Sequence, residues 1–150
     1  MTFEPKDPNF SSRVTESFKR QTVMRTIGAR LIRVAPGQVE IELPFNIAFT
    51  QQHGFLHAGV VSTIADSACG YAALSLAAPE TAVLTVEYKI NLLAPAAGDR
   101  FIARGRVVRP GKTVTVCTGD VMAVMGVAEK PIAAIQATIM HLNDRADLKD

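Results

Sequence analysis

Hydrophobic and polar residues alternate over several stretches of the chain, and such alternation is typical of β-strands with one packed and one solvated face. Residues 38–43 (QVEIEL) show the pattern most cleanly, and a Pro36-Gly37 turn joins them to residues 30–34. Later segments rich in Val, Ile and Thr, bounded by Pro and Gly, extend the prediction. The predicted strands are residues 30–34, 38–43, 82–93, 100–108, 113–125 and 131–142.

Residues 82–93 form the clearest predicted strand, and their alternation assigns each side chain to one face of the sheet. The apolar face is expected to carry Leu84, Val86, Tyr88, Ile90 and Leu92. The polar face is expected to carry Thr85, Glu87, Lys89 and Asn91. Thr85 is therefore expected to meet either solvent or a bound substrate.

Residues 51–76 (QQHGFLHAGVVSTIADSACGYAALSL) follow a different pattern, in which a polar loop with two histidines leads into small and apolar residues. The stretch has room for about five helical turns. Apolar residues lie on nearly every side of this predicted helix, which is typical of a buried helix. Asp66 is its one charged residue.

Residues 12–27 predict a shorter helix on the surface of the core, with Ser11 or Ser12 as N-cap and Gly28 as its end. The last four strands are joined by short turns, so we expect them to form an antiparallel meander. One apolar helix and one curved sheet predict an α+β fold in which the sheet wraps the helix. We expect one domain over residues 1–150, with residues 1–11 and 143–150 as loose tails.

Composition narrows the classes of function. The formal net charge is +2 and the basic residues are scattered, which argues against nucleic acid or an anionic membrane as partner. We find no pattern of a membrane span or signal peptide. Cys69 and Cys117 lie in apolar contexts without a CxxC pattern, which favours reduced thiols in a cytoplasmic protein. Two loop histidines and a remote Asp66 form no compact ligand set, so we expect no metal, and no phosphate-loop motif indicates a cofactor.

Asp66 is the strongest candidate for chemistry, because a carboxylate among apolar residues is costly unless it is hydrogen-bonded or functional. The functional interpretation makes it a general base or a nucleophile. The structural alternative makes it a satisfied buried acid, bonded to Ser62 or paired with an arginine. The sequence leaves both open.

The predicted start of the buried helix offers a second group of candidates. His57, with the backbone amides of Ala58 and Gly59, could stabilise negative charge that develops on a carbonyl oxygen. Gln51 could orient a water molecule or the carbonyl. The structural alternative is that these are ordinary capping and loop residues.

His57 and Asp66 are nine residues apart, which on a straight helix is about 13–14 Å. The two side chains of one chain therefore cannot act on the same carbon atom. A two-fold dimer with antiparallel helices would bring His57 of one subunit near Asp66 of the other. Any mechanism that uses both residues requires such an interface.

The sequence resembles the hotdog-fold acyl-CoA thioesterases of the phenylacetate-degradation type. The resemblance rests on residues 54–59 (GFLHAG), with Asp66 nine residues after the histidine, where family members have G-x-L-H-G-G and an acid at the same spacing. Residues 85–96 (TVEYKINLLAPA) and Gly111-Lys112-Thr113 add to it. The similarity extends over residues 28–142.

This resemblance implies a long helix wrapped by a curved antiparallel sheet, a homodimer that often pairs into a homotetramer, and hydrolysis of an acyl-CoA thioester without a cofactor. It makes Asp66 the nucleophile or general base, Ala58 with Gly59 the site of the thioester oxygen, and Thr85 a residue that places the attacking water. His57 and Gln51 would orient the carbonyl or the water. Arg109, Gly111 and Lys112 would meet the nucleotide phosphates; by themselves they are typical solvated turn residues.

Ala58 departs from the family pattern, because relatives have Gly at this position. Alanine keeps the backbone N–H, but its methyl group changes the space around the thioester. Two other functions therefore stay open. One is an acyl-thioester dehydratase or hydratase, although the Asp-x-Asn-Pro-x-His pattern of those relatives is missing. The other is a non-catalytic acyl-CoA-binding protein, in which Asp66 is a relic.

Overall fold

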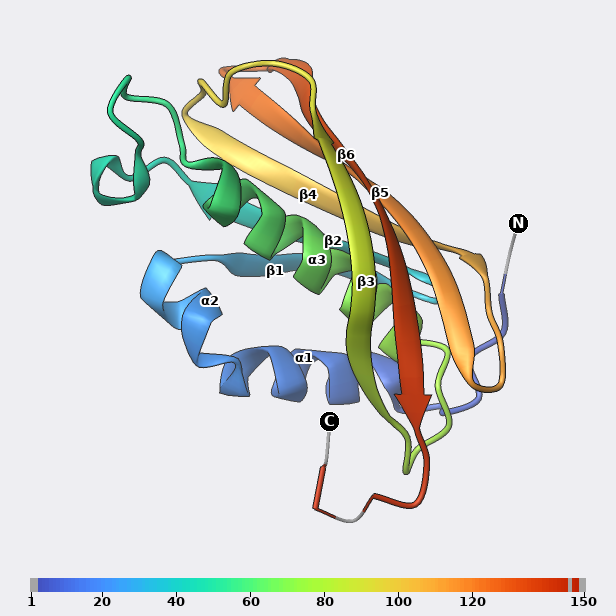
Figure 1. Cartoon of the computed structure of the whole chain (residues 1–150). Coiled ribbons are helices and arrows are strands. Elements are labelled where there is room, and N and C mark those ends of the chain that lie inside the picture. The colour runs from blue at the N-terminus through green and yellow to red at the C-terminus, as the bar shows by residue number, and fades with distance from the viewer. Residues whose placement is uncertain (1–2, 146, 149–150) are drawn as a thin grey trace.

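The computed structural model describes residues 3–145, 147 and 148, and it consists of one six-stranded antiparallel sheet curved around a long helix (Figure 1). The predicted α+β class, with a sheet wrapping a buried helix, is confirmed. The helices are α1 (Phe10–Arg20), α2 (Thr22–Ile27) and α3 (Ala58–Leu74), with a short 3-10 helix at Ile47–Phe49. The strands are β1 (Arg30–Ala35), β2 (Gln38–Pro44), β3 (Ala82–Leu92), β4 (Arg100–Arg109), β5 (Val114–Met125) and β6 (Ala128–Leu142).

The sheet order is β1-β2-β4-β5-β6-β3, so the predicted meander of the last four strands is wrong for β3. Strands β4, β5 and β6 do form hairpin neighbours, but β3 pairs with β6 at the edge of the sheet. Segment 93–99 crosses the end of the sheet instead of turning back. Backbone hydrogen bonds hold its path, from Leu93 N–H to Ile132 O (2.8 Å) and from Leu56 N–H to Ala96 O (3.1 Å).

A β-bulge in β3 breaks the predicted alternation. Thr85 pairs with Ile139 and Glu87 with Thr138, so the two strands shift register between Thr85 and Glu87. Ile139 is fully buried on the inner face, which places Thr85 on that face too. The prediction that Thr85 shares a face with Glu87, Lys89 and Asn91 is therefore wrong, because the extra bulge residue reverses the side-chain direction.

Helix α3 packs on the sheet at two glycines that are cross-strand partners, Gly105 of β4 and Gly119 of β5. A Cβ atom on Gly105 would lie 2.3 Å from the backbone carbonyl of Ala68, so only glycine allows this approach. A Cβ on Gly119 would lie 3.4 Å from the Cys69 sulfur. The small residues of the helix and these glycines together bring the backbones into direct contact.

The N-terminal region forms two helices rather than the single one predicted, because Gln21 adopts an extended conformation between α1 and α2. Helix α1 begins at Phe10 after Asn9, so Ser11 and Ser12 are not its N-cap. Gly28 ends α2 with a φ of 77°, as predicted.

The expectation that residues 1–11 form a loose arm is wrong for the residues next to α1. Asp7 is buried and forms a 3.1 Å ion pair with Arg13. The Arg13 guanidinium also donates to the carbonyls of Leu74 (3.0 Å) and Ala78 (2.8 Å), at the end of α3. Arg13 therefore ties α1 to the C-terminal end of the central helix. Of the expected tails, residues 1, 2, 146, 149 and 150 lie outside the described residues.

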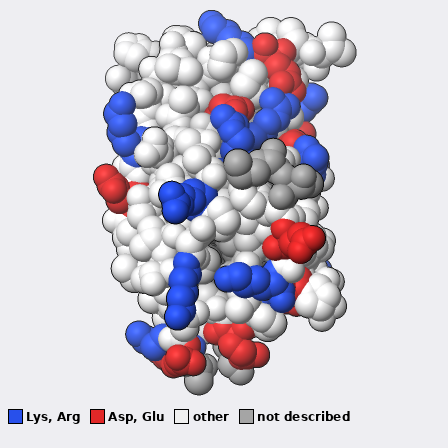
Figure 2. Space-filling model, turned by 90° about the vertical axis from the view of Figure 1, so that its right-hand side faces the viewer, with Lys and Arg blue, Asp and Glu red and all other residues white. Residues whose placement is uncertain are grey.

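Charged side chains of both signs are interspersed on the face drawn in Figure 2, without a large patch of one sign. On the sheet, charged side chains pair across neighbouring strands, such as Arg33 with Glu40 (3.1 Å) and Arg106 with Asp120 (2.9 Å). Such exposed pairs contribute little to stability. Among the helices of the described residues, none has the length and apolar character needed to cross a membrane.

Candidate active site

His57 is the N-cap of α3, and its side chain folds back onto the first turn of the helix. Its Nδ1 accepts a 2.8 Å hydrogen bond from the backbone N–H of Gly59. Gly59 makes room for the ring, since a Cβ atom there would lie only 3.1 Å from Nδ1. The spacing of His57 and Gly59 in the sequence is therefore explained by a capping contact.

This contact fixes which hydrogen-bond donors remain at the helix start. Because Nδ1 accepts a hydrogen bond, a neutral His57 carries its proton on Nε2, which is free to donate. The Gly59 amide is already used by the cap. The Ala58 amide has no partner among the described residues, and no carbonyl within the helix can reach it. Ala58 N–H is thus the amide best placed to meet a ligand oxygen.

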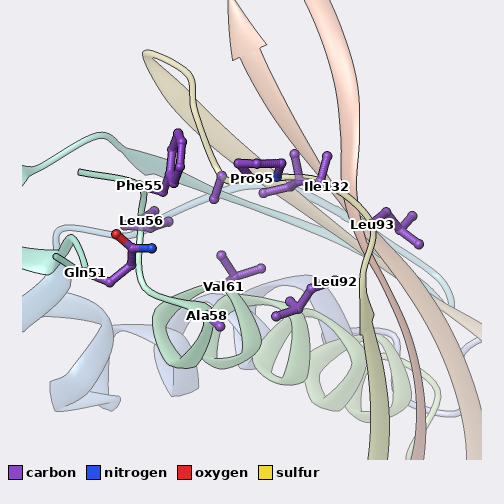
Figure 3. Close-up of a pocket in the computed structure, with 11 residues that line it drawn as sticks. Gln51, Phe55, Leu56, Ala58, Val61, Leu92, Leu93, Pro95 and Ile132 are labelled. Carbon is purple, nitrogen blue, oxygen red and sulfur yellow. The ribbon is translucent and has the colours of Figure 1, made fainter. Parts of the chain in front are cut away.

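A pocket of about 450 Å³ opens beside Ala58 (Figure 3). Ala58 and Val61 border it from α3, Leu92 from the end of β3, and Pro95 and Ile132 from the opposite side. The loop before α3 contributes Gln51, Phe55 and Leu56. Gln51 is held in this loop because its side-chain oxygen accepts a hydrogen bond from the backbone N–H of His53.

Asp66 lies on α3, and its carboxylate is half-buried against β3. Its Oδ1 accepts a 2.8 Å hydrogen bond from the Thr85 hydroxyl. The alternative prediction that Asp66 bonds to Ser62 is wrong, because the Ser62 hydroxyl donates to the carbonyl of Ala58 (2.9 Å). Burial raises the pKa of Asp66, and the hydrogen bond from Thr85 opposes that rise. The structure therefore holds a carboxylate that is more basic than usual and oriented by a hydroxyl.

Asp66 borders a second pocket, of about 310 Å³, which shares no lining residue with the pocket at Ala58. Gln21 borders this second pocket and its side-chain oxygen accepts a 3.1 Å hydrogen bond from Ser67. Nothing in the sequence marks Gln21 as a site residue, because it lies inside a predicted continuous helix. The break between α1 and α2 is what turns Gln21 towards α3.

Within one chain, the Ala58 amide and the Asp66 carboxylate stand apart. Helix α3 runs without interruption from Ala58 to Leu74, so the eight-residue step from Ala58 to Asp66 spans about 12 Å. The two groups also face different pockets. Within one chain these two groups therefore cannot contact the same small ligand.

Arg109, Gly111 and Lys112 lie at the far end of the molecule from Ala58. Val114, just after this turn, pairs with Met140, which in turn pairs with Leu84 near the start of β3. Ala58 instead adjoins Leu92 at the end of β3. Gly111 is required by the turn itself, since a Cβ there would lie 2.0 Å from the carbonyl oxygen of Val114. The structure does not bring these three residues to Ala58 of the same chain.

The remaining polar candidates form no metal site among the described residues, where no group of three or more His, Cys, Asp or Glu side chains could hold an ion. Cys69 and Cys117 are free and buried, as predicted. The Cys117 thiol donates to the carbonyl of Cys69 (3.4 Å). Burial raises the pKa of the Cys117 thiol to about 12, so it has little thiolate character.

Comparison with known proteins places this geometry in a family. Residues 53–127, which include Ala58, Asp66 and Thr85, match the family described as "Thioesterase superfamily". Among curated proteins, the "Putative esterase SSO2140" of Saccharolobus solfataricus is 33% identical over 104 residues, which are 69% of this chain and 74% of that protein. The 1,4-dihydroxy-2-naphthoyl-CoA hydrolase of Listeria monocytogenes is 27% identical over 94 residues, covering 63% and 76%.

Solved structures of similar fold include other members of this family. A thioesterase family protein from Silicibacter pomeroyi has 54% sequence identity and a TM-score of 0.88, covering 89% of this chain and 98% of its own. The PaaI protein of the E. coli phenylacetic acid degradation operon has 19% identity and a TM-score of 0.79, covering 90% and 94%. The latter similarity concerns the fold alone, which is the one that the sequence resemblance implied.

Proposed function

The chain belongs to the thioesterase superfamily, with the hotdog fold, and on that basis we propose that it hydrolyses acyl-CoA thioesters to a free acid and CoA. The observation that carries this proposal is that α3 presents two groups suited to thioester hydrolysis. One is the Ala58 amide, which has no hydrogen-bond partner among the described residues, and the other is the Asp66 carboxylate, which Thr85 orients. A CoA thioester is the substrate class of one relative, the hydrolase of Listeria monocytogenes.

Ala58 N–H is the proposed donor to the thioester oxygen. A backbone amide at a helix N-terminus is already oriented and favours negative charge, so it stabilises the oxyanion that forms in the transition state. His57 Nε2–H is the second proposed donor, because the Gly59 contact at Nδ1 fixes the proton on Nε2. Gln51 borders the same pocket and orients the thioester carbonyl.

Asp66 is the proposed base or nucleophile. As a base it removes a proton from water while the water oxygen bonds to the carbonyl carbon; as a nucleophile its own oxygen forms that bond. In either case the tetrahedral oxyanion collapses, the C–S bond breaks, and the thiolate of CoA leaves with the electron pair. With Asp66 as base, this collapse gives the free acid directly. With Asp66 as nucleophile, it leaves a mixed anhydride, which water then hydrolyses to release the acid and restore the carboxylate. The raised pKa makes Asp66 a better base, and the Thr85 hydroxyl orients it.

The proposed mechanism requires a homodimer, because Ala58 and Asp66 of one chain lie apart on α3. Strand β3 is an edge of the sheet, and its exposed apolar side chains include Leu84 (54%), Val86 (52%) and Tyr88 (45%). An exposed apolar edge strand favours pairing with another chain. If two β3 strands pair antiparallel about a two-fold axis, the helices also run antiparallel, and Ala58 of one chain approaches Asp66 of the other.

The same symmetry offers a role for the Arg109–Lys112 turn. In one chain this turn lies beside the start of β3, opposite to Ala58. Antiparallel pairing of β3 would bring the turn of one chain towards the Ala58 pocket of its partner. Arg109 and Lys112 are exposed and cationic, so we propose that they bind the phosphates of CoA.

The direct test is release of free thiol from a panel of acyl-CoAs (acetyl, octanoyl, palmitoyl, phenylacetyl and hydroxybenzoyl). The wild type should hydrolyse at least one ester, and Asp66→Asn should lower kcat by about a hundredfold or more. Asp120→Asn is the matched control, since Asp120 lies on the outer face of the sheet in a surface ion pair. Binding of the esters without release of thiol would instead identify a non-catalytic acyl-CoA-binding protein.

A further inference from the structure

Gln21 lies at the bend between α1 and α2 and borders the pocket at Asp66. Its backbone is held on both sides, because its N–H donates to the carbonyl of Phe18 (3.1 Å) and its carbonyl accepts from the N–H of Met24 (3.1 Å). The extended conformation of Gln21 (φ −73°, ψ 96°) interrupts the helix, and its side chain reaches α3. The bend thus holds a polar side chain beside the Asp66 carboxylate.

A hydrogen bond from Ser67 orients the Gln21 amide. The Ser67 hydroxyl donates to Oε1 of Gln21 (3.1 Å), and Ser67 is only 8% exposed, so solvent competes little for this contact. Because Oε1 accepts from Ser67, Nε2 is the end of the amide left for other partners. Among the described residues, none accepts a hydrogen bond from Nε2. Gln21 therefore brings an unused donor to the border of the pocket.

The other polar groups at this pocket show where a matching acceptor lies. The Thr85 hydroxyl donates to Oδ1 of Asp66 (2.8 Å), so its hydrogen is already used. The Tyr71 hydroxyl accepts a hydrogen bond from Ser17 of α1 (3.5 Å). No group of the described residues donates to Oδ2 of Asp66. The pocket therefore offers a donor at Gln21 Nε2 and an acceptor at Asp66 Oδ2.

A water molecule that bridges these two groups is oriented for attack on a thioester. It donates one hydrogen to Asp66 Oδ2 and accepts a hydrogen bond from Gln21 Nε2, so one of its lone pairs stays unused. That lone pair can attack the carbonyl carbon. Without the contact to Gln21, the water keeps only its bond to Asp66 and can rotate about it.

We propose that Gln21 is a catalytic residue whose Nε2–H holds the attacking water against Asp66, and that Ser67 is a positioning residue that orients the Gln21 amide. The proposal rests on the proposed thioesterase function and makes Asp66 the base rather than the nucleophile. The water oxygen bonds to the carbonyl carbon while its proton passes to Oδ2, and the electron pair of the C=O bond moves to the thioester oxygen. When this oxyanion collapses, the C–S bond breaks, the thiolate leaves with the electron pair, and Asp66 releases the proton to solvent.

Gln21→Met keeps the length of the side chain and removes its hydrogen-bonding groups. The kcat should fall by about 10- to 100-fold with KM changed by less than about threefold, because the lost contact is to the water and not to the substrate. Gln38→Met is the matched control and should keep wild-type turnover, since Gln38 is exposed on β2, which β4, β5 and β6 separate from β3. Melting temperatures verify folding. Wild-type kcat in Gln21→Met would overturn the proposal and leave the thioesterase function standing.

Gln21→Glu separates the donor from the contact with Ser67. Glutamate keeps an oxygen for the Ser67 hydroxyl, but it replaces Nε2 with an oxygen that cannot donate when ionised. The acidic limb of the pH–rate profile should shift to higher pH, because a second carboxylate disfavours ionisation of Asp66. The plateau above that limb should stay about 10- to 100-fold below the wild type. A plateau equal to that of the wild type would show that no donor is needed and would overturn the proposal.

Ser67→Ala tests the positioning role through a double-mutant cycle. Alone it should lower kcat by about threefold to tenfold, because the Gln21 amide is then less well oriented. Added to Gln21→Met, it should cause no further loss, since it acts only through that amide. Equal losses in both backgrounds would overturn the positioning role of Ser67.

Single turnovers in heavy-oxygen water, with enzyme in excess over acyl-CoA, test the role of Asp66. If the held water attacks, the acid released in the first turnover carries one solvent oxygen. A first acid without solvent oxygen would show that Asp66 supplied the oxygen as nucleophile, which would overturn this proposal but not the thioesterase function. A wild type that releases thiol from no acyl-CoA would reject both.

Discussion

The Thr85 hydroxyl donates a 2.8 Å hydrogen bond to Oδ1 of Asp66, which connects the edge strand β3 to the central helix α3. This contact exists because the bulge in β3 turns Thr85 to the inner face of the sheet. It opposes the effect of burial, which raises the pKa of Asp66. The contact therefore orients the carboxylate and limits the increase in its pKa.

Thr85→Ala should shift the acidic limb of the pH–rate profile to higher pH. The carboxylate must be ionised to act as base or nucleophile, and loss of the hydrogen bond lets the pKa of Asp66 rise further. Activity at neutral pH should also fall, because the carboxylate is less well oriented. The profile of kcat/KM against pH measures the shift. Thr85→Ser keeps the hydroxyl and should restore the wild-type limb; an unchanged limb in Thr85→Ala would contradict this role.

Asp66→Asn should stabilise the folded protein at neutral pH. Because the pKa of Asp66 is higher in the folded state, the folded state binds more protons in the pH range between the unfolded and folded pKa values. The free energy of unfolding thus falls as pH rises through this range and stays lowered above it. The variant should therefore unfold at a higher urea concentration than the wild type at pH 7.

Urea denaturation at fixed protein concentration measures this gain. It should shrink as the pH falls below the folded pKa of Asp66, since the wild type is then protonated and resembles the amide. Asp120→Asn should change stability by no more than about 0.5 kcal/mol. A destabilised Asp66→Asn at pH 7 would show that the carboxylate is a structural group rather than one retained for chemistry.

His57 should contribute separately to stability and to turnover. His57→Ala removes the acceptor for Gly59 N–H, which should cost about 1 kcal/mol of stability. His57→Ser supplies another N-cap and should recover most of that loss. Neither variant can donate a hydrogen bond from the position of Nε2, so both should lose turnover. Full activity in His57→Ser would show that His57 acts only as a cap.

Gly105→Ala and Gly70→Ala should change stability in opposite directions. A Cβ on Gly105 would overlap the backbone of α3 at Ala68, and we expect a loss of about 3 kcal/mol or more. Gly70 lies within α3, and nothing is within 4 Å of a Cβ built there. Its substitution should stabilise the helix by about 0.5–1 kcal/mol. Chemical denaturation of both variants compares them; tolerance of Gly105→Ala would contradict the close packing.

The strands and the central helix could be predicted from sequence because both depend on local patterns. Residues 38–43 alternate between polar and apolar, and the residues around Asp66 are apolar on nearly every side. These patterns indicate a strand and a buried helix without any knowledge of the elements that pack against them. The position of β3 beside β6 could not be predicted in this way. Segment 93–99 is short enough to suggest a hairpin, and its path depends on backbone contacts with residues distant in sequence, such as Leu56 and Ile132.

The sequence indicates the candidate residues but not their contacts. His57 and Ala58 stand out at the start of the predicted buried helix and Asp66 as its one charged residue. The Thr85 contact depends on a bulge that leaves no pattern in the sequence. The use of the Gly59 amide by His57 is likewise a matter of side-chain direction. Gln21 was missed because nothing in residues 12–27 marks the break between α1 and α2.

Ala58→Pro removes the proposed oxyanion donor with little disturbance of the helix. Ala58 is the first residue of α3, where proline is well tolerated, and the extended backbone of His57 (φ −62°, ψ 136°) suits a residue before proline. Turnover should fall by about 10²–10³-fold. Ala58→Gly keeps the amide and should remain active. Wild-type turnover in Ala58→Pro would exclude this amide as the donor.

The central claim is that each active site combines Ala58 of one chain with Asp66 of another, and mixing two inactive variants tests it most directly. Co-expression of differently tagged Ala58→Pro and Asp66→Asn chains, followed by tandem purification, yields mixed dimers. Each mixed dimer would contain one intact site and one doubly altered site.

Thiol release should therefore return to about half of the wild-type rate per dimer, because one of two sites is complete. Homodimers of either variant, prepared in the same way, should stay nearly inactive. Mixed dimers as inactive as both homodimers, with the folding of each chain verified, would contradict a site shared between chains.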